Sequence, residues 1–302
     1  MVNFPSPTAT FHSKVYPAIA PTRPELSVKG KTVLVTGGGS GIGAETARYF
    51  AQAGATRIAL LGRREQPLLD TKASILDKFP AIEVFTASTD VTKKTEVDAA
   101  FDQFLGGGRK LDILISAAAV IGPQESVTEA DPDGFLEGIE QNLAGSLYVA
   151  RAFARYATPK ATAVDVSSSA AHVNFGMCAS YSIAKWAVYR LWDMLAFQFP
   201  DLRVFHIQPG IVDTAMNRST GPAGGIAAAG HEDDVSLPAG FSVWLASPEA
   251  DFLKGKFLWT NWDVGELKIR ADDIQKGNML NIDLVGWPFT YGGNDWKFEA
   301  QP

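Results

Sequence analysis

The fold class of this chain is decided by the stretch Thr32-Val33-Leu34-Val35-Thr36-Gly37-Gly38-Gly39-Ser40-Gly41-Ile42-Gly43. Its first five residues are apolar or β-branched without alternation, which is typical of a strand buried on both faces of a parallel sheet. The glycine-rich turn lets the backbone approach an anion, and the first amides of the following helix favour negative charge there. An ordinary strand-to-helix turn is the alternative. The residues expected to line a phosphate-binding turn are Gly37, Gly39, Ser40, Gly41, Ile42 and Gly43.

Outward from this stretch, short apolar runs alternate with longer segments of helical periodicity, which predicts repeated strand–helix–strand units. The expected strands are Thr32–Thr36, Arg57–Leu61, Glu83–Ala87, Ile113–Ser116, Ala163–Val166, Arg203–Ile207 and Lys256–Thr260. The expected helices are Gly41–Ala53, Pro67–Phe79, Lys93–Leu105, Phe135–Arg155, Tyr181–Phe199 and Asp234–Ala246. No repeat or long linker divides them. We therefore expect one α/β domain, a doubly wound Rossmann-type fold with a seven-stranded parallel sheet flanked by helices on both faces, rather than two domains.

Extensions are expected on both sides of this body, which we place at residues 28–264. Residues 1–27 contain five prolines and predict an extended arm. The Gly- and Ala-rich segment Ala215–Gly230 predicts a part of the chain that bends freely. Residues 265–302 form a C-terminal aromatic extension, for which packing on the body or on a second subunit is favoured over a catalytic role. Its aromatic residues include Trp287, Phe289, Tyr291 and Trp296.

Composition excludes several classes of function. A net charge of -6 argues against general binding to nucleic acid or to anionic membranes, although a local basic site for one phosphate remains open. One cysteine, Cys178, rules out an intrachain disulfide framework, and four scattered histidines predict no metal site. No stretch approaches the roughly 18 apolar residues of a membrane-spanning helix, and no secretory, transit or peroxisomal pattern is present. We therefore expect a cytoplasmic protein.

The end of the second predicted strand addresses the type of nucleotide. An acidic residue about 20 residues after the glycine turn would bind the ribose hydroxyls of NAD, whereas arginine suits the 2′-phosphate of NADP. Here the chain reads Leu61-Gly62-Arg63-Arg64, with two guanidinium groups and no carboxylate at this position. A solvated surface, partly neutralised by Glu65, is the alternative. The pattern favours NADP(H) over NAD(H).

Candidate catalytic residues follow in the second half. Tyr181 and Lys185 lie one helical turn apart and share a helix face, so that the ammonium group favours the phenolate form of the tyrosine. Such a pair alone is common on protein surfaces. Upstream, however, a predicted strand ends in Ser167-Ser168-Ser169, and the carboxyl ends of strands are where open α/β sheets place their sites. A serine there can donate a hydrogen bond to a substrate oxygen.

Taken together, these motifs resemble the short-chain dehydrogenase/reductase family over Lys31–Val264. The glycine turn matches the family's Thr-Gly-x-x-x-Gly-x-Gly, and Ser168, Tyr181 and Lys185 fall at its active-site spacing. The resemblance implies an adenine-contacting pair at Asp90 and Val91 and a fourth catalytic residue at Asn142. It also implies a loop that orients the nicotinamide, which contributes Pro209, Gly210, Val212 and Thr214.

Two departures from the family pattern concern the fourth strand and the C-terminus. Ser116-Ala117-Ala118-Ala119 stands where the family has Asn-Asn-Ala-Gly, which affects sheet stabilisation and the cofactor contact expected at Ala117. The residues after Val264 exceed the family's usual length. The resemblance implies a homo-oligomer, a dimer or a tetramer. The arm and the C-terminal extension resemble those of fungal members that act in secondary metabolism.

The resemblance implies an NADP(H)-dependent carbonyl reductase or alcohol dehydrogenase. Tyr181 would exchange the proton, Ser168 would hold the substrate oxygen, Lys185 would bind the nicotinamide ribose, and Asn142 would anchor a water chain. Alternatives are a non-redox lyase, isomerase or cyclase that retains NADP, and a regulatory protein that binds NADP(H) without turnover.

The substrate pocket is predicted from loops at Val120–Thr128, His172–Cys178 and Ala215–Gly230, whose apolar character favours a small apolar ketone or alcohol. For Cys178, packing as a small buried hydrophobic residue is favoured over lining the pocket. For His172, contact with the substrate and a solvent-facing position in a loop are about equally favoured.

Overall fold

The structure is a computed structural model in which residues 6–219 and 232–284 are described. Most of the predicted flexible segment, from residue 220 onward, lies outside these ranges. The predicted aromatic contacts of the C-terminal extension also lie outside them; they concern Trp287, Phe289, Tyr291 and Trp296.

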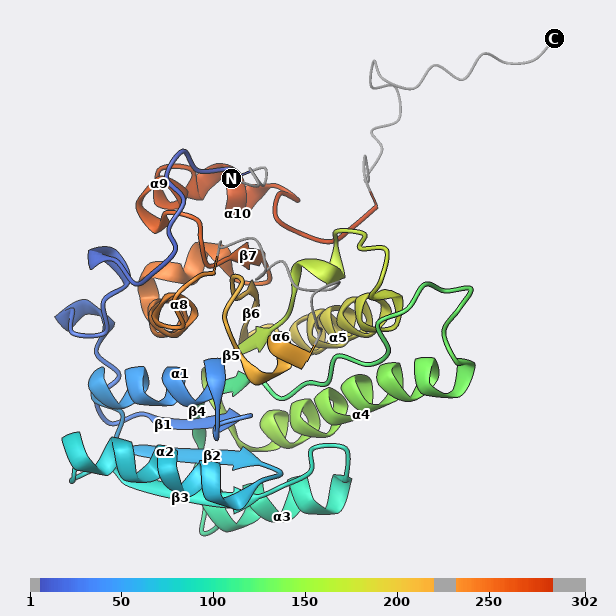
Figure 1. The fold of residues 1–302 in the computed structure, drawn as a ribbon. Helices are drawn as coiled ribbons and strands as arrows, with labels where there is room; N and C mark the ends of the chain where they lie inside the picture. The colour runs from blue at the N-terminus through green and yellow to red at the C-terminus, as the bar shows by residue number, and fades with distance from the viewer. Residues whose placement is uncertain (1–5, 220–231, 285–302) are drawn as a thin grey trace.

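One parallel sheet of seven strands runs through the molecule in the order β3-β2-β1-β4-β5-β6-β7 (Figure 1). The strands are β1 (Thr32–Thr36), β2 (Arg57–Gly62), β3 (Glu83–Ser88), β4 (Leu111–Ser116), β5 (Ala157–Val166), β6 (Arg203–Gln208) and β7 (Phe257–Trp259). Every pair of neighbours is parallel. The strand order reverses between β1 and β4, and a ligand crevice is expected outside the carboxyl ends of these strands. The predicted fold class is confirmed.

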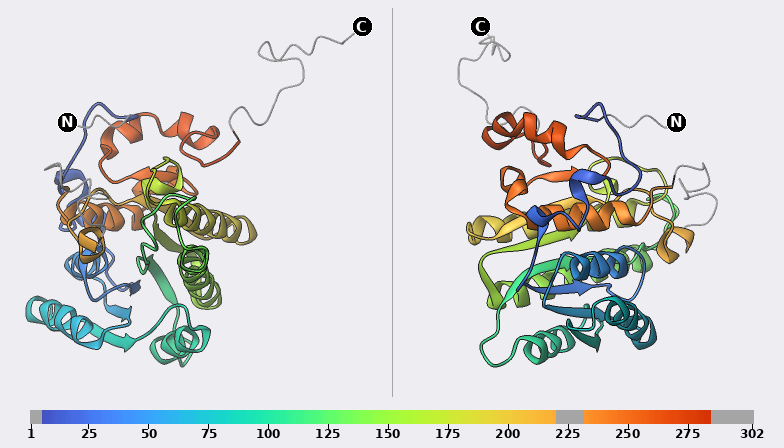
Figure 2. Two further views of the ribbon diagram at one scale, coloured as in Figure 1. Left: turned by 45° about the vertical axis from the view of Figure 1, so that its right-hand side comes forward. Right: turned by 90° about the vertical axis from the view of Figure 1, so that its left-hand side faces the viewer.

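Two layers of helices cover the two faces of the sheet (Figure 2). One layer contains α1 (Gly41–Gln52), α2 (Glu65–Lys78) and α8 (Ser236–Ala246), and the other contains α3 (Lys94–Leu105), α4 (Pro132–Tyr156) and α5 (Ala179–Gln198). Val33 and Val35 of β1 belong to the apolar core under the first layer, whereas Leu34 belongs to the core under the second. Because both faces are buried, the strand has no polar alternation.

Two element boundaries differ clearly from the predicted ones. α4 begins at Pro132 rather than at Phe135, because the carboxylate of Asp131 accepts the N–H of Gly134 at 2.8 Å and caps the helix. β5 begins at Ala157 rather than at Ala163. Its first half is irregular, with Lys160 at a φ of 61° and a register shift against β4. Because of this irregularity, the first half has no strand pattern that the sequence analysis could recognise.

The described part of the arm, residues 6–27, is extended only in part. It contains two short 3-10 turns, η1 (Pro17–Ile19) and η2 (Pro24–Leu26), which bury Ile19 and Leu26. Phe11 forms an antiparallel bridge with Trp262, three residues after the end of the edge strand β7, so the arm is bound beside the end of this strand. The division into arm, body and extension stays a prediction.

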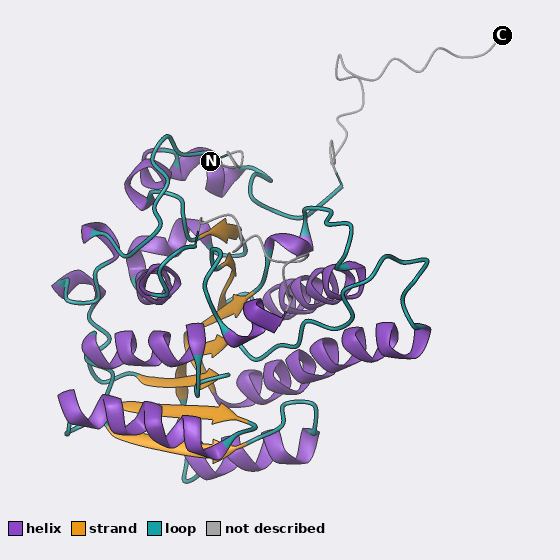
Figure 3. Cartoon of the chain, viewed as in Figure 1, coloured by secondary structure: helices purple, strands orange, loops and turns teal. Residues whose placement is uncertain are grey.

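Short elements complete the described chain: η3 (Ser169–Ala171), α6 (Ala215–Ser219), η5 (Pro248–Leu253), α9 (Val264–Ile269) and α10 (Ala271–Lys276). The sequence analysis predicted none of these. Within residues 6–219 and 232–284, no helix has both the length and the apolar character needed to cross a membrane. Loops that follow the strands gather at the carboxyl end of the sheet (Figure 3).

Candidate active site

A cavity of about 820 Å³ opens at the carboxyl ends of the central strands. This volume lies in the upper part of the range of small-molecule and cofactor sites, roughly 300–1,000 Å³. All predicted site residues line this one cavity. They are Gly37, Gly39, Ser40, Gly41, Ile42, Gly43, Arg63, Arg64, Asp90, Val91, Ala117, Asn142, Ser168, Tyr181, Lys185, Pro209, Gly210, Val212 and Thr214.

The glycine turn leaves no room for side chains. A Cβ atom on Gly43 would lie 2.4 Å from the carbonyl oxygen of Gly37, and Gly37 itself has a φ of +71°. Ser40 precedes α1 in an extended conformation, and its side chain makes no capping hydrogen bond within the described chain. The first amides of α1 therefore remain available to an anion. This cradle fits the pyrophosphate of a dinucleotide.

Thr36 connects the glycine turn to the segment that departs from the family pattern. Its hydroxyl oxygen accepts the backbone N–H of Ala117 at 3.0 Å and that of Ala118 at 3.2 Å. These two bonds join the ends of β1 and β4. The junction is therefore held by backbone donors and one hydroxyl, without the asparagine side chains of the family motif.

The end of the cavity beside β2, where the adenosine of a dinucleotide is expected, carries the two arginines. Arg63 and Arg64 follow β2 and are exposed. Within the described ranges the structure shows no ion pair from either guanidinium group, and Glu65, the first residue of α2, does not neutralise them. They are placed to pair with a phosphate that enters the cavity.

Asp90 lies two residues after β3 and lines the same cavity as the arginines. Its carboxylate accepts the backbone N–H of Thr92 at 3.0 Å and the Thr92 hydroxyl at 2.8 Å. Burial raises the pKa of Asp90, but the hydrogen bonds from Thr92 and the charge of Arg63 outweigh burial and lower the pKa overall. Asp90 is therefore an ionised acceptor beside the expected adenine position.

Lys185 is almost completely buried, with 4% of its surface exposed. Its Nζ donates to the carbonyl oxygen of Val166, the last residue of β5, at 2.8 Å. The same Nζ lies 5.6 Å from the ring centroid of Tyr181, one turn earlier on α5. One hydrogen bond thus fixes the ammonium group near the phenol and ties α5 to the end of β5.

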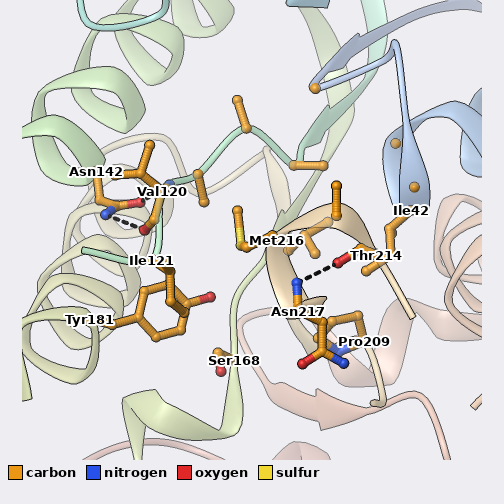
Figure 4. Close-up of a pocket in the computed structure, with 18 of the residues that line it drawn as sticks. Ile42, Val120, Ile121, Asn142, Ser168, Tyr181, Pro209, Thr214, Met216 and Asn217 are labelled. Carbon is orange, nitrogen blue, oxygen red and sulfur yellow. Dashed lines mark hydrogen bonds between the residues drawn. The ribbon is translucent and has the colours of Figure 1, made fainter. Parts of the chain in front are cut away.

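Ser168 caps η3, the turn that follows β5. Its hydroxyl oxygen accepts the N–H of Ala170 at 3.2 Å, which orients the side chain at the carboxyl end of β5. Figure 4 shows Ser168 and the hydroxyl of Tyr181 on the same side of the pocket, with the phenol pointing into it. A substrate oxygen placed between them would meet two hydroxyl groups.

Asn142 fixes the segment after β4 to α4. Its Oδ1 accepts the N–H of Val120 at 3.1 Å, and its Nδ2 donates to the carbonyl oxygen of Val120 at 2.9 Å (Figure 4). The same Nδ2 also donates to the carbonyl oxygen of Gly138 at 2.8 Å. The side-chain amide is therefore fully engaged with the backbone. Its predicted role in a water chain stays a prediction.

The loop after β6 packs against the glycine turn. Thr214 lies so near α1 that a Cβ atom on Gly41 would be 3.0 Å from its methyl group. The Thr214 hydroxyl accepts the N–H of Asn217 at 3.1 Å and starts α6. In Figure 4, Met216 projects from this side towards the pocket.

Further lining residues lie in the three loops from which the sequence analysis predicted the substrate pocket, although no motif identifies them individually. Phe175, Met177 and Met216 give the substrate end an apolar and adaptable surface. Gln124 also lines the cavity, and its Nε2 is buried without a hydrogen-bond partner in the described chain.

The structure also bears on Cys178, for which one interpretation was favoured, and on His172, for which two were left open. Cys178 is half-buried and lines the cavity, with its Sγ 3.6 Å from the Ser182 hydroxyl, so it is not a fully buried core residue. His172 lies outside the cavity lining. Its side chain is in part exposed, and its Nε2 accepts the indole N–H of Trp259 at 3.0 Å, so it connects η3 to β7.

Comparison with known proteins agrees with this geometry. The family model for short chain dehydrogenases matches residues 31–224. A short chain dehydrogenase/reductase of Claviceps purpurea is 32% identical over 94% of this chain and 96% of its own length. The short chain dehydrogenase/reductase AacuD of Aspergillus aculeatus is 32% identical over 93% of this chain and 98% of its own length.

Solved structures show the same fold. A short chain dehydrogenase of Shigella flexneri, complexed with NADP, matches with a TM-score of 0.70 at 22% identity, over 79% of this chain and 99% of that one. A dehydrogenase/reductase of Sinorhizobium meliloti matches with a TM-score of 0.70 at 25% identity, over 83% and 99% of the two chains. The glycine turn, the tyrosine–lysine pair and these relatives lead to one conclusion: the chain belongs to the short-chain dehydrogenase/reductase family.

Proposed function

We propose that the protein is an NADP(H)-dependent carbonyl reductase or alcohol dehydrogenase that uses Tyr181 as its general acid and base. The observation that carries the proposal is the convergence of Ser168, Tyr181 and Lys185 on one cavity that begins at the glycine turn. These residues offer a proton donor, a hydrogen-bond donor and a fixed positive charge, and proton exchange coupled to hydride transfer uses all three.

In the reducing direction, the nicotinamide supplies the hydride that the carbonyl carbon accepts. Tyr181 donates its phenolic proton to the carbonyl oxygen, and the hydroxyl of Ser168 donates a hydrogen bond to the same oxygen and stabilises its developing charge. Lys185 keeps a fixed positive charge beside the phenolate that remains, and it offers a donor to the nicotinamide ribose. Oxidation of an alcohol reverses these steps.

The proposed preference for NADP(H) rests on Arg63 and Arg64. Both are exposed at the cavity, and no carboxylate at the end of β2 takes the place that would bind ribose hydroxyls. A free guanidinium group binds a phosphate bidentately, which a 2′-hydroxyl cannot reproduce. The Shigella flexneri relative, which was solved as a complex with NADP, supports this choice.

For the substrate we propose a small, mainly apolar ketone or alcohol with a second oxygen acceptor. Phe175, Met177 and Met216 supply the apolar walls, since thioethers pack well against flat or irregular apolar groups. The buried Nε2 of Gln124 lacks a partner within the described residues and is a donor for the second oxygen. Gln124→Leu should therefore raise KM for such a ketone more than for its analogue without the second oxygen.

The decisive experiment follows NADPH absorbance across a panel of apolar ketones. Loss of NADPH with formation of alcohol supports the reductase. Conversion of substrate without loss of NADPH would indicate the lyase, isomerase or cyclase alternative. NADPH binding without conversion of any substrate would indicate the regulatory alternative, and absence of NADPH binding would refute the proposal.

We also propose that the protein is a cytoplasmic homo-oligomer, a dimer or a tetramer, and that it serves fungal secondary metabolism. Exposed apolar side chains lie along one face of α5, at Ile183, Trp186 and Phe197, and α4 adds Leu136 and Leu147. Such a surface favours burial against a second copy. Light scattering coupled to gel filtration measures the oligomeric state, and Trp186→Glu should shift it towards the monomer.

A further inference from the structure

The loop that closes the nicotinamide end of the cavity is held from behind by one carboxylate. Asp233 Oδ2 accepts the N–H of Ile211 at 2.8 Å, and the N–H of Asp233 donates to the carbonyl oxygen of Ile211 at 2.7 Å. Val212 and Asp233 also form an isolated parallel bridge. Gly210, Ile211 and Val212 all line the cavity, so this bonding fixes cavity-lining backbone.

The position of Asp233 also explains the glycine next to it. Gly210 has a φ of +89°, and a Cβ atom there would lie 2.7 Å from Asp233 Oδ2. The loop can therefore approach the carboxylate only because residue 210 has no side chain. Asp233 lies directly against the loop, although it does not line the cavity itself.

The second oxygen of this carboxylate connects to the arm. Asp233 Oδ1 accepts from Asn261 Nδ2 at 3.0 Å, and the same Nδ2 donates to the carbonyl oxygen of His12 at 2.9 Å. Asn261 is 2% exposed, so both amide hydrogens are used in a buried place. A continuous series of hydrogen bonds thus leads from His12 through Asn261 and Asp233 to the loop.

The arm is firmly bound where this series begins. The N–H of His12 donates to the carbonyl oxygen of Asn261 at 2.7 Å, and the N–H of Asp234 donates to the carbonyl oxygen of Ser13 at 2.7 Å. The His12 ring lies 3.5 Å from the Tyr16 ring in a stacked arrangement and pairs with Asp263 at 2.9 Å. Residues 11–13 therefore behave as a part of the folded body.

We infer that Asp233 is a positioning residue for the loop at Pro209–Thr214, and that residues 11–13 of the arm hold it in place through Asn261. The arm thereby contributes to binding of the nicotinamide end without touching the cofactor. This inference rests on the proposed function for its kinetic consequences alone, because the bonding of the loop can be measured directly.

The direct test is hydrogen exchange of the peptide that contains Ile211. In Asp233→Ala the protection of this amide should fall roughly tenfold, the effect of one lost hydrogen bond, while peptides of β1 and α5 keep their protection. Asp233→Asn is the conservative variant, because its amide can accept from Ile211 or from Asn261 but places an N–H against the other. Its effect should be intermediate.

A pair of matched variants distinguishes a specific effect of the Asn261 hydrogen bonds from a general loss of order in the arm. Asn261→Leu removes both N–H donors of the series but leaves Asp233 in place, whereas Asp263→Asn removes the carboxylate charge beside the His12 ring and keeps every hydrogen bond of the series. We expect faster exchange at Ile211 in Asn261→Leu and unchanged exchange in Asp263→Asn. Unchanged exchange at Ile211 in both Asp233→Ala and Asn261→Leu, or an equal increase in Asp263→Asn, would overturn the inference.

Kinetics then tests the functional part. If Asp233 positions the loop, Asp233→Asn should raise the NADPH dissociation constant roughly three- to tenfold, with the larger part of the effect in KM rather than kcat. A wild-type protein that fails to bind NADPH would refute the proposed function and leave the exchange result valid. Normal NADPH affinity in a variant with fast exchange would refute the role of Asp233 in cofactor binding.

Discussion

The two ends of the cavity are prepared in opposite ways. At the nicotinamide end, Lys185 and Asn142 already bond to backbone carbonyl groups of β5, α4 and the segment after β4. At the adenosine end, Arg63 and Arg64 are exposed and make no ion pair within the described chain. The groups proposed for proton transfer are fixed in place, whereas the groups proposed for recognition of the phosphate await a charge from the ligand.

This difference has a physical reason. Proton transfer needs a fixed geometry, because small displacements of the donor lower the rate steeply. Selection between two nucleotides needs only a difference in charge, and an exposed arginine gains most when the anion arrives with the ligand. We therefore expect substitutions at the first end to reduce turnover and substitutions at the second end to reduce cofactor affinity.

The largest effect is expected for Tyr181→Phe. The ring remains but the proton is lost, so kcat should fall roughly a thousandfold while the dissociation constant for NADPH stays within about twofold. Tyr189→Phe, on the same helix and outside the cavity lining, is the matched control and should keep its activity. A Tyr181→Phe enzyme with near wild-type turnover would remove the distinction between the two ends.

The next effect concerns the adenosine end. In the double variant Arg63→Ala/Arg64→Ala, the dissociation constant for NADPH should rise roughly thirtyfold, since two charge-assisted contacts to phosphate are lost. Binding of NADH should hardly change. Arg270→Ala, an exposed arginine away from the cavity, controls for the loss of positive charge. Equal weakening of NADPH and NADH binding would contradict selection by these arginines.

Glu249, which lies outside the cavity, extends the comparison between paired and unpaired charges. Unlike the two arginines, it already has partners of opposite charge within the protein. Glu249 accepts from Arg23, Lys268 and the indole N–H of Trp244. Burial raises the pKa of Glu249, but these hydrogen bonds outweigh burial and lower it from 4.5 to about 2. Since the folded pKa is the lower one, the stabilisation is complete above pH 4.5 and is lost as the pH falls towards 2.

Glu249→Gln should therefore lower the free energy of unfolding by about 2 kcal/mol at pH 6, after allowance for solvent screening, and by much less near pH 2. Urea unfolding at both pH values measures the difference. Glu25→Gln, at a more exposed carboxylate beside the same arginine, is the control and should have little effect. A pH-independent loss would assign the effect of Glu249 to packing rather than to charge.

The smallest effect on stability is expected at Thr36, which joins the ends of β1 and β4 between the two ends of the cavity. Thr36→Val keeps the shape of the side chain but removes the acceptor for the N–H groups of Ala117 and Ala118, so the free energy of unfolding should fall by about 1 kcal/mol. Thr46→Val, which removes a hydroxyl that donates to Ile42 within α1, is the matched control. If both variants are equally stable, the junction does not depend on Thr36.

Much of the fold follows from local sequence. The apolar strands and the glycine turn predicted all seven strands because each pattern reports burial of both faces or a backbone conformation. The first half of β5 escaped prediction, because Pro159 and the positive φ of Lys160 make this strand irregular. The short helices α9 and α10 escaped as well, since six residues carry too little periodicity.

The site divides in the same way. Residues within a motif, such as Tyr181 and Lys185, are predictable from spacing because one helix sets their distance. Gln124 reaches the cavity from an irregular segment and Met216 from the five-residue helix α6, and the positions of both depend on tertiary contacts. The bonds of Asn142 to Val120 and of Asn261 to His12 join distant parts of the chain, and neither side chain carries a local pattern that reveals its partner.

The seating of the arm on the end of the sheet has a consequence for synthesis. His12 and its partner Asn261 are 249 residues apart in the chain. A ribosome that adds about 5–20 residues per second needs roughly 10–50 seconds to make that interval. During this time Ile19 and Leu26 cannot make all of their native contacts with later parts of the chain. The arm can therefore dock fully only after β7 and Asn261 have been synthesised.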